Sequence, residues 1–263
     1  MQTAMYSALF GALTNEHRMN SIANNLANVN TTGYKRDQLA FQDTFYMYAH
    51  DMMMEAASSI RDKKMFPEPT HFARPRIATA VTDFQQAGLK VTGAPFDLAI
   101  NGEGFFRVTA PDGNQYYTRN GHFRTTAEGL LITEQGFAVQ GEGGDITLPP
   151  GYRNLVIAEN GRVFADGVQV AQIALVVVDE PGNLEKRGNN LFVPRQGAEV
   201  NEMDVDYNRS WMAQGFLESA NVDPVYEMVN MIETQRQFEA YQKVMQTADA
   251  LDKESYGKVG RNR

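Results

Sequence analysis

The sequence predicts an α+β protein in which a mainly antiparallel β region lies between two long terminal helices. Apolar residues recur at helical spacing over residues 1–28 and again over residues 224–252. Most of residues 77–215 instead consists of short strand-like runs that alternate with glycine-containing turns. No segment with helical periodicity interrupts that middle region, so we expect the helices only at the two ends.

The N-terminal helix carries apolar residues alternately four and three positions apart, which is the spacing of an a/d seam. Glu16 is the one residue that breaks the series. A helix with a single apolar stripe is marginal alone in water, so we expect this stripe to serve as an assembly interface. The predicted interface residues on it are Met5, Leu9, Met19, Ala23 and Leu26, with Ala12 in the same series.

A second stripe on this helix consists of Asn20, Asn24 and Asn28. Asparagine is a poor helix former, so three in one line need a reason. One interpretation is fraying of the helix before the turn at 30–33, where Gly33 suits a helix stop. The other is a ladder of amides that bonds to a neighbouring chain and fixes its register. The sequence leaves both open, and the three amides are also predicted interface residues.

The C-terminal helix has a defined start. Asp223 is placed to cap the helix, and Pro224 suits its first position, where the missing N–H is no loss. The apolar residues that follow recur with a period of about 3.5 to 3.6 and line one face. The predicted interface residues here are Met231, Ile232, Phe238, Tyr241, Met245 and Leu251.

The middle region is predicted to be built from hairpins. Asn-Gly and Asp-Gly pairs are the strongest short hairpin signals, and they occur at Asp112-Gly113, Asn120-Gly121, Asn160-Gly161 and Asp166-Gly167. The continuous apolar run Ile173–Val178 is the best candidate for a strand buried on both faces.

The sequence divides into three parts by composition. Pro67, Pro69 and Pro75 favour an extended or hinged linker between the first helix and the β region. The run Met52–Met54 fits either an adaptable contact surface or a helix turn packed on its own domain. The expected parts are 1–35 with 216–263 as a terminal helical domain, 36–76 as a linker, and 77–215 as a β-rich outer domain.

Charge and composition exclude several classes of function. The net charge of −8 argues against nucleic acid or an anionic membrane as the main partner. The absence of cysteine excludes disulfides and thiol chemistry, and no segment approaches the ~18 apolar residues of a membrane-spanning helix. The stretch Ala4–Leu13 has the length of a signal-peptide core but lacks a preceding basic residue, so we expect a mature helix there.

No constellation of catalytic residues is evident. The four histidines lie in separate segments without metal-ligand spacing. Gly102-Glu103-Gly104 begins like a dinucleotide loop, but Arg107 occupies the place of its third glycine and no helix follows. There is no phosphate-binding P-loop and no G-x-S-x-G motif. We therefore predict no catalytic, cofactor-binding or metal-binding residue, and no enzyme.

These residues resemble a known family. The run Ala23–Lys35 resembles the N-terminal signature of bacterial flagellar axial proteins, the rod and hook subunits, and Ser219–Val229 with Gln246–Asp249 resembles their C-terminal signature. The segments Asp97–Phe106 and Tyr117–Phe123 are similar to the middle of rod proteins. Chain length is similar to that of a rod subunit, and Met5–Ala8 with Thr82–Leu89 favours a proximal-rod over a distal-rod member.

The resemblance implies a fold and a set of partners. The terminal helices would pair as a coiled-coil-like hairpin that forms an inner tube, with the β region outside. Copies of the chain would polymerise helically with each other and with neighbouring rod proteins, and form a shaft that transmits torque across the periplasm. The flagellar type III export apparatus would export the chain without a cleavable signal peptide. Nucleic acid and direct membrane insertion are not expected.

One alternative of another class stays open at this point. The chain fits a β-rich module that binds peptidoglycan and uses its helices only as an oligomerisation stalk. Tyr116, Tyr117 and Phe123 would then line a glycan site, although packing in a core explains these aromatic residues more simply.

Overall fold

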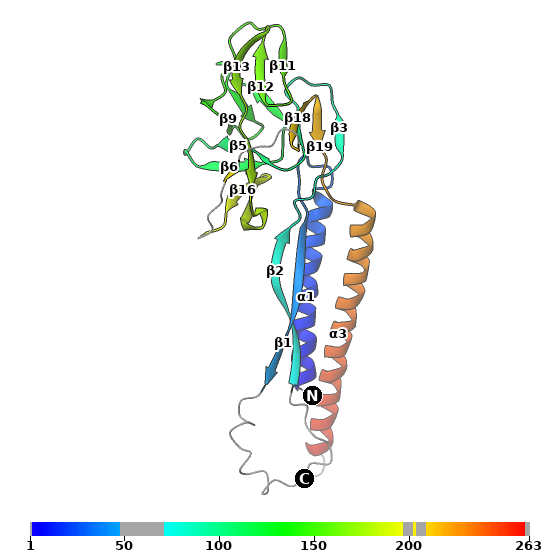
Figure 1. Ribbon diagram of the computed structural model, residues 1–263. Helices are drawn as coiled ribbons and strands as arrows, with labels where there is room; N and C mark the ends of the chain where they lie inside the picture. Colours follow the sequence, from blue (N-terminus) through cyan, green and yellow to red (C-terminus); the bar gives the residue numbers. More distant parts are fainter. Residues whose placement is uncertain (1, 48–70, 197–201, 204–208, 261–263) are drawn as a thin grey trace. The chain divides into compact units, whose positions relative to one another are not determined.

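A computed structural model describes residues 2–47, 71–196, 202–203 and 209–260 (Figure 1). The predicted contact run Met52–Met54 and most of the predicted linker lie outside these residues. The chain divides into two compact units. The helical unit comprises Met1–Asn24, Gln38–Val81 and Val225–Arg263, and the β unit comprises Asn25–Asp37 and Thr82–Pro224.

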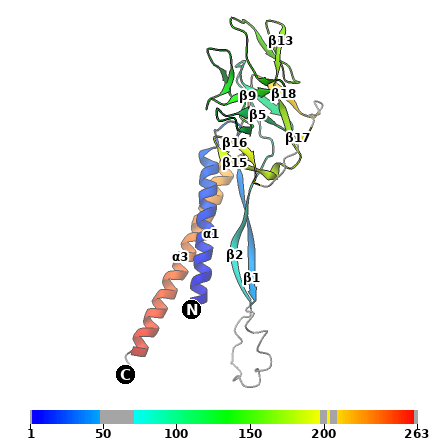
Figure 2. The ribbon, with the colours of Figure 1, turned by 90° about the vertical axis from the view of Figure 1, so that its left-hand side faces the viewer.

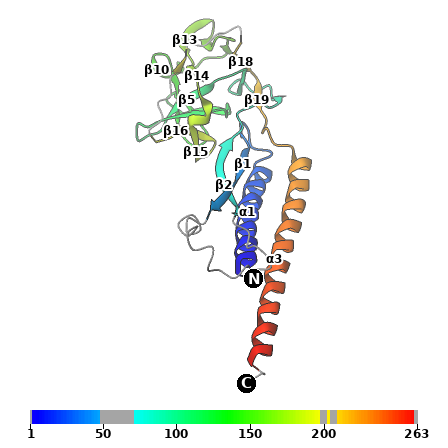
Figure 3. The same ribbon diagram turned by 60° about the horizontal axis from the view of Figure 1, so that its bottom comes forward.

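The helical unit contains most of α1 (Gln2–Ala27) and α3 (Pro224–Gly260). Strands β1 (Asp37–Met47) and β2 (His71–Thr82) pair with each other. The two helices lie alongside each other within the unit (Figure 3). They touch where the ring of Tyr241 packs on Gly11, so closely that a Cβ at Gly11 would be 2.5 Å from the ring carbon Cζ.

The predicted coiled-coil-like hairpin is wrong, although α+β describes the chain. The described residues contain two α-helices and a large antiparallel β region, and between the described residues of α1 and α3 there is no extended seam of contacts. The physical reason lies in the side chains of α1. In its first half the small Ala8 and Ala12 are buried, whereas the larger Leu9 and Leu13 are exposed; the large apolar Ile22 is buried only further along the helix. Small side chains cannot supply the knobs that interlock two helices along their length.

The β unit is built from short antiparallel strands, as predicted (Figure 2). Its largest sheet has ten strands, of which seven follow the order β15-β16-β6-β5-β9-β8-β7, while β10 pairs with β9 and β14 pairs with β5 and β17. The bounds are β5 (Phe105–Thr109), β6 (Gln115–Thr118), β7 (Phe123–Thr125), β8 (Leu131–Thr133), β9 (Ala138–Gly141), β10 (Gly144–Asp145), β14 (Leu175–Val178), β15 (Leu184–Gly188), β16 (Leu191–Pro194) and β17 (Glu202–Met203).

Among its described residues the unit also has three smaller sheets and one short 3-10 helix, which precedes β15. One sheet has the order β11-β12-β13, and the other two are the pairs β18-β4 and β19-β3. The bounds are β3 (Leu89–Val91), β4 (Leu98–Asn101), β11 (Leu155–Ile157), β12 (Arg162–Ala165), β13 (Val168–Gln172), β18 (Trp211–Gln214), β19 (Phe216–Glu218) and η2 (Pro181–Asn183).

Three of the four predicted hairpin turns are confirmed. Asp112-Gly113 joins β5 to β6, Asn160-Gly161 joins β11 to β12, and Asp166-Gly167 joins β12 to β13. Asp166 and Gly167 both have positive φ, at 50° and 84°, as a type I′ turn requires.

The fourth predicted turn, Asn120-Gly121, is not a hairpin, because β6 and β7 pair with other strands. Gly121 is needed there for a different reason. The chain passes so close to Leu98 that a Cβ at Gly121 would lie 1.7 Å from the Leu98 carbonyl oxygen.

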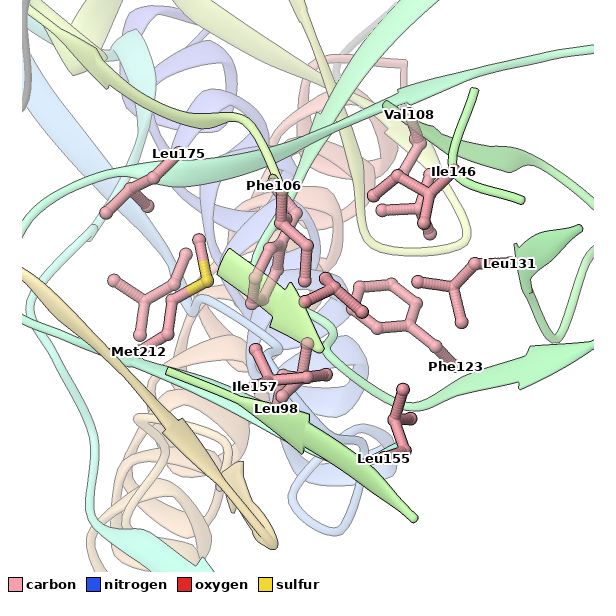
Figure 4. Packing of buried hydrophobic residues seen from close by; sticks show 14 of the residues in the cluster. Leu98, Phe106, Val108, Phe123, Leu131, Ile146, Leu155, Ile157, Leu175 and Met212 are labelled. Carbon is pink, nitrogen blue, oxygen red and sulfur yellow. The ribbon is translucent and has the colours of Figure 1, made fainter. Parts of the chain in front are cut away.

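The core of the β unit lies between its sheets. Leu98, Phe106, Phe123, Leu155 and Met212 come from different strands and point toward one another (Figure 4). The rings of Phe106 and Phe123 meet edge to face with centroids 5.2 Å apart, an arrangement that aromatic pairs prefer. All four residues of β14 are buried, which confirms the prediction of a strand covered on both faces.

Candidate functional site: the joint and the helix faces

The two terminal signatures of the chain meet inside the β unit. Lys35 follows the end of α1, and Glu218 is the last residue of β19, just before α3. The Lys35 Nζ atom lies 2.7 Å from Glu218 Oε1, and both side chains are 1% exposed. Nζ also donates to the Gln85 carbonyl at 2.7 Å. We call the cluster of Asn25, Gly33–Lys35, Arg119, Glu218 and Asn221 the joint.

The Glu218 carboxylate is the centre of the joint. Oε1 also accepts a hydrogen bond from the Ala87 N–H at 2.9 Å, and Oε2 accepts one from Arg119 Nη1 at 3.3 Å. Arg119 Nη2 in turn donates to the Gly102 carbonyl at 2.9 Å. A buried carboxylate costs several kcal/mol to desolvate unless cations and N–H donors surround it, and Glu218 has both.

Burial also acts on the cations of the joint. It lowers the pKa of Lys35 below the ordinary 10.5, while the neighbouring Glu218 carboxylate opposes part of that change. Burial likewise lowers the pKa of Arg119. The guanidinium of Arg119 lies over the ring of Phe105, 5.3 Å from its centroid, which adds a favourable cation–π contact.

Two asparagine side chains tie the neighbouring backbone into the joint. The Oδ1 of Asn25, in the last turn of α1, accepts hydrogen bonds from the Tyr34 hydroxyl and the Asp37 N–H, both at 3.0 Å. Near the start of α3, Asn221 accepts from the Arg36 N–H at 2.6 Å and donates to the Asp83 carbonyl at 2.7 Å. The end of one helix and the approach to the other are thus held by one network.

Gly33 lets the two signatures approach each other. Its N–H donates to the Glu218 carbonyl at 2.8 Å, and its φ is +66°. A Cβ at this position would lie 2.5 Å from the backbone atoms Arg119 C and Asn120 N. Only glycine satisfies both conditions, the left-handed backbone and the close contact.

The helices carry the predicted interface residues on surfaces that are at least partly accessible. None of the fourteen is buried. Leu9, Asn20, Ala23, Asn24, Ile232 and Leu251 are exposed, while Met5, Met19, Leu26, Asn28, Met231, Phe238, Tyr241 and Met245 are half-buried. α3 begins at Pro224, directly after Asp223, and the capping role of these two residues stays a prediction.

The asparagine stripe separates into different roles. α1 ends at Ala27, and Asn28 Oδ1 accepts a hydrogen bond from the Thr31 hydroxyl at 3.2 Å, so Asn28 stabilises the turn. Asn20 and Asn24 are exposed, and their contact with a neighbouring chain stays a prediction. Asn15, which the sequence analysis did not single out, is instead 6% exposed, and its Nδ2 has no hydrogen-bond partner in the described part of the chain.

Sequence reasoning missed the joint, although its residues lie in the two signatures. Lys35, Glu218 and Asn221 stand beside turns, where charged and amide side chains are ordinarily solvated. The one available signal was their place in the signatures that carried the family resemblance.

Other candidate chemistry is weaker. Tyr117 and Phe123 are buried in the core and Tyr116 packs against it, so these rings do not line an exposed glycan site. His122 Nδ1 lies 2.6 Å from Asp97 Oδ1, but the described residues hold no group of acidic and histidine side chains suited to a metal. Neither described helix is long and apolar enough to cross a membrane.

Several protein-family models and known proteins are similar to this chain. Three family models match: "Flagella basal body rod protein" over residues 5–35, "Flagellar hook protein FlgE/F/G D1 domain" over 99–165, and "Flagellar basal body rod FlgEFG protein C-terminal" over 213–255. The flagellar basal-body rod protein FlgF of Caulobacter vibrioides is 32% identical over 262 residues, 99% of each chain. The rod protein FlgG of Agrobacterium fabrum is 32% identical over 257 residues, 94% of this chain and 96% of the relative.

The fold and the joint define a structural building block, which combines a β unit with two helices that carry accessible apolar side chains. The full-length relatives make that class specific: the chain belongs to the flagellar basal-body rod protein family. It is therefore a structural component of the flagellar basal body, which it builds together with other rod proteins, and not an enzyme.

Proposed function

We propose that this chain polymerises helically through its terminal helices and so forms part of the drive shaft that transmits torque across the periplasm. The observation that carries the proposal is the exposed apolar surface on both helices, on α1 around Leu9 and on α3 around Ile232 and Leu251. Large apolar side chains in contiguous exposed patches mark contact sites. Heterologous contacts between copies that do not close into a ring produce a filament or tube.

The joint supports the same proposal. A shaft transmits torque only if each subunit resists internal deformation, and the joint holds the end of α1 and the approach to α3 through a buried charge network. The β unit would then stiffen the wall and fix the angle between subunits.

A single substitution on α3 tests the proposal. Ile232→Asp places a charge on an exposed apolar surface, so the chain should fold but not enter basal bodies, and cells that carry it should be non-motile. Gln237→Asp adds the same charge at another exposed position of the same helix and should preserve motility. Normal motility with Ile232→Asp, or incorporation of a chain that lacks residues 224–263, would contradict assembly through α3.

We place the subunit in the proximal rod, on the basis of Met5–Ala8 and Thr82–Leu89. Relatives named FlgF and FlgG match at the same identity of 32%, so the test has to be functional. The gene should restore motility to a strain that lacks FlgF and not to one that lacks FlgG. The reverse result would place the chain in the distal rod.

We also propose export through the flagellar type III apparatus without a cleavable signal peptide. The test is secretion of the chain by strains with and without that apparatus. The chain should appear outside the cytoplasm at full length only when the apparatus is present, and appearance in both strains would reject this route.

A further inference from the structure

Two apolar stripes on the helices are exposed. The α1 stripe consists of Tyr6, Leu9 and Leu13, and the α3 stripe consists of Val225, Met228, Val229 and Ile232. Each side chain in them is between 42% and 67% exposed. Both stripes follow the i, i+3 or i+4, i+7 spacing of one helix face.

The two stripes match in length and chemistry. Each spans seven residue steps, which is about 10 Å of helix at 1.5 Å per residue. Neither contains a charged side chain. Two such surfaces would bury each other without leaving an unpaired charge, which is the condition for a favourable apolar contact.

Within one copy the two stripes lie at different positions along the helix axes. The contact between Gly11 and Tyr241 places Leu9 opposite about residue 243 of α3, because the two helices run in opposite directions (Figure 3). That position is 14 residues beyond Val229, so the stripes are offset by about 21 Å along the helices. One copy cannot bring its own two stripes together.

We infer that the α1 stripe of one copy packs on the α3 stripe of the next copy, and that the two copies are therefore displaced by about 21 Å along the helices. This inference rests on the proposed function, since it names the surfaces through which the polymer forms. Copies in an open polymer share one axial direction, so the neighbouring helices run antiparallel. Tyr6 then faces Ile232, Leu9 faces Val229, and Leu13 faces Val225. Because the two surfaces differ, the contact is heterologous and extends without closing.

In the competing arrangement, which we call level, neighbouring copies are not displaced along the helices. This arrangement would place Leu9 against Val244, with Leu251 as the next exposed apolar residue of α3. Those two residues are two turns apart, and the exposed polar residues Lys243, Gln246 and Thr247 lie around and between them. The staggered contact buries four exposed apolar side chains of α3 against the α1 stripe. In the level arrangement the same stripe faces residues 240–247, where Val244 is the exposed large apolar residue. The burial of apolar surface therefore favours the stagger.

Cysteine cross-linking tests the inference directly, because the natural chain contains no cysteine. The staggered pairs are Leu9→Cys with Val229→Cys, and Leu13→Cys with Val225→Cys. The matched level pair is Leu9→Cys with Val244→Cys, and the four single variants are controls. A short bis-maleimide is added to purified basal bodies that contain each full-length variant. Covalent dimers and higher species of the chain are expected from both staggered pairs, and not from the level pair or the single variants.

Three outcomes would overturn the inference: cross-links from the level pair alone, dimers from a single variant, or no cross-link from either staggered pair present in basal bodies. The proposed function has a separate readout, which is the amount of the wild-type chain in the same preparation. Its absence there would reject assembly into the rod. Its presence without staggered cross-links would reject only the displacement.

Discussion

The Lys35 ammonium and the Glu218 carboxylate are 183 positions apart in sequence, and the structure places them 2.7 Å apart with both side chains buried. This ion pair joins the segment that leaves α1 to the segment that enters α3. Replacing such a pair by apolar residues is often neutral for stability, whereas removal of one partner is strongly destabilising. We therefore expect the pair to specify which segments meet, more than it adds to the net stability of the fold.

Glu218→Gln should destabilise the β unit strongly. The substitution preserves size but leaves the buried Lys35 and Arg119 without a counter-charge, and loss of one partner of a buried pair costs roughly 3–5 kcal/mol. Urea denaturation of the full chain, followed at the β-unit transition, measures the loss. Asp249→Asn is the matched control, because it breaks the Lys253–Asp249 pair, which has the same 2.7 Å distance but lies on the surface. A comparable loss in both variants would show that burial of the joint is unimportant.

The stability that depends on Lys35 should rise with pH. Because burial lowers the pKa of Lys35 below 10.5, the unfolded chain binds more protons than the folded chain between the folded pKa and 10.5. The free energy of unfolding therefore increases with pH across that window. Relative to Lys35→Met, which lacks the group, the wild-type chain should gain stability as pH rises from neutral toward 10.5. A difference that is constant or shrinks over that range would contradict the direction of the shift.

Gly33→Ala should be far more harmful than Gly113→Ala. Both glycines have positive φ, +66° and +83°, but a Cβ at Gly33 meets backbone at 2.5 Å, whereas nothing lies within 4 Å of one at Gly113. Gly113→Ala therefore incurs only the backbone penalty of about 1–2 kcal/mol. Gly33→Ala must also push apart the two chain segments that meet at the joint, and so lengthen the hydrogen bond from its N–H to the Glu218 carbonyl. Thermal unfolding of the two variants compares the backbone penalty alone with the backbone penalty plus the close contact. Equal melting temperatures would show that the close contact is easily relieved.

The sequence was informative where local chemistry decides the structure. The apolar periodicity of residues 1–28 and 224–252 predicted both helices, and Asp166-Gly167 predicted a hairpin because only a few residue types adopt positive φ. The run Ile173–Val178 predicted a strand buried on both faces, since no polar residue marks a solvent side.

The sequence was uninformative where the partner is distant. Nothing near Glu218 indicates that its partners are Lys35 and Arg119, because the connection is made by tertiary folding. Asn120-Gly121 has the residue types of a hairpin turn, but glycine is needed there because the chain passes close to Leu98. The a/d spacing on α1 predicted a seam through Leu9 and Ala12, and of these two Ala12 is buried while Leu9 is exposed. The neighbouring Ala8 and Gly11, outside the series, are buried as well. Periodicity therefore located the helix but only part of the face that it buries.

The contact between Gly11 and Tyr241 gives a last prediction, for the pairing of the two helices. Gly11→Leu should lower the thermal stability of the helical signal in circular dichroism. Leucine favours a helix over glycine by up to about 1 kcal/mol, but overpacking against the Tyr241 ring opposes this gain by typically 1–3 kcal/mol. His17→Leu, at an exposed position of α1, gains helix propensity without overpacking and should not be destabilised. Tyr241→Ala removes the ring, so in combination with Gly11→Leu it should recover part of the loss. If the double variant were as unstable as the sum of the single variants, the two residues would not be in contact in solution.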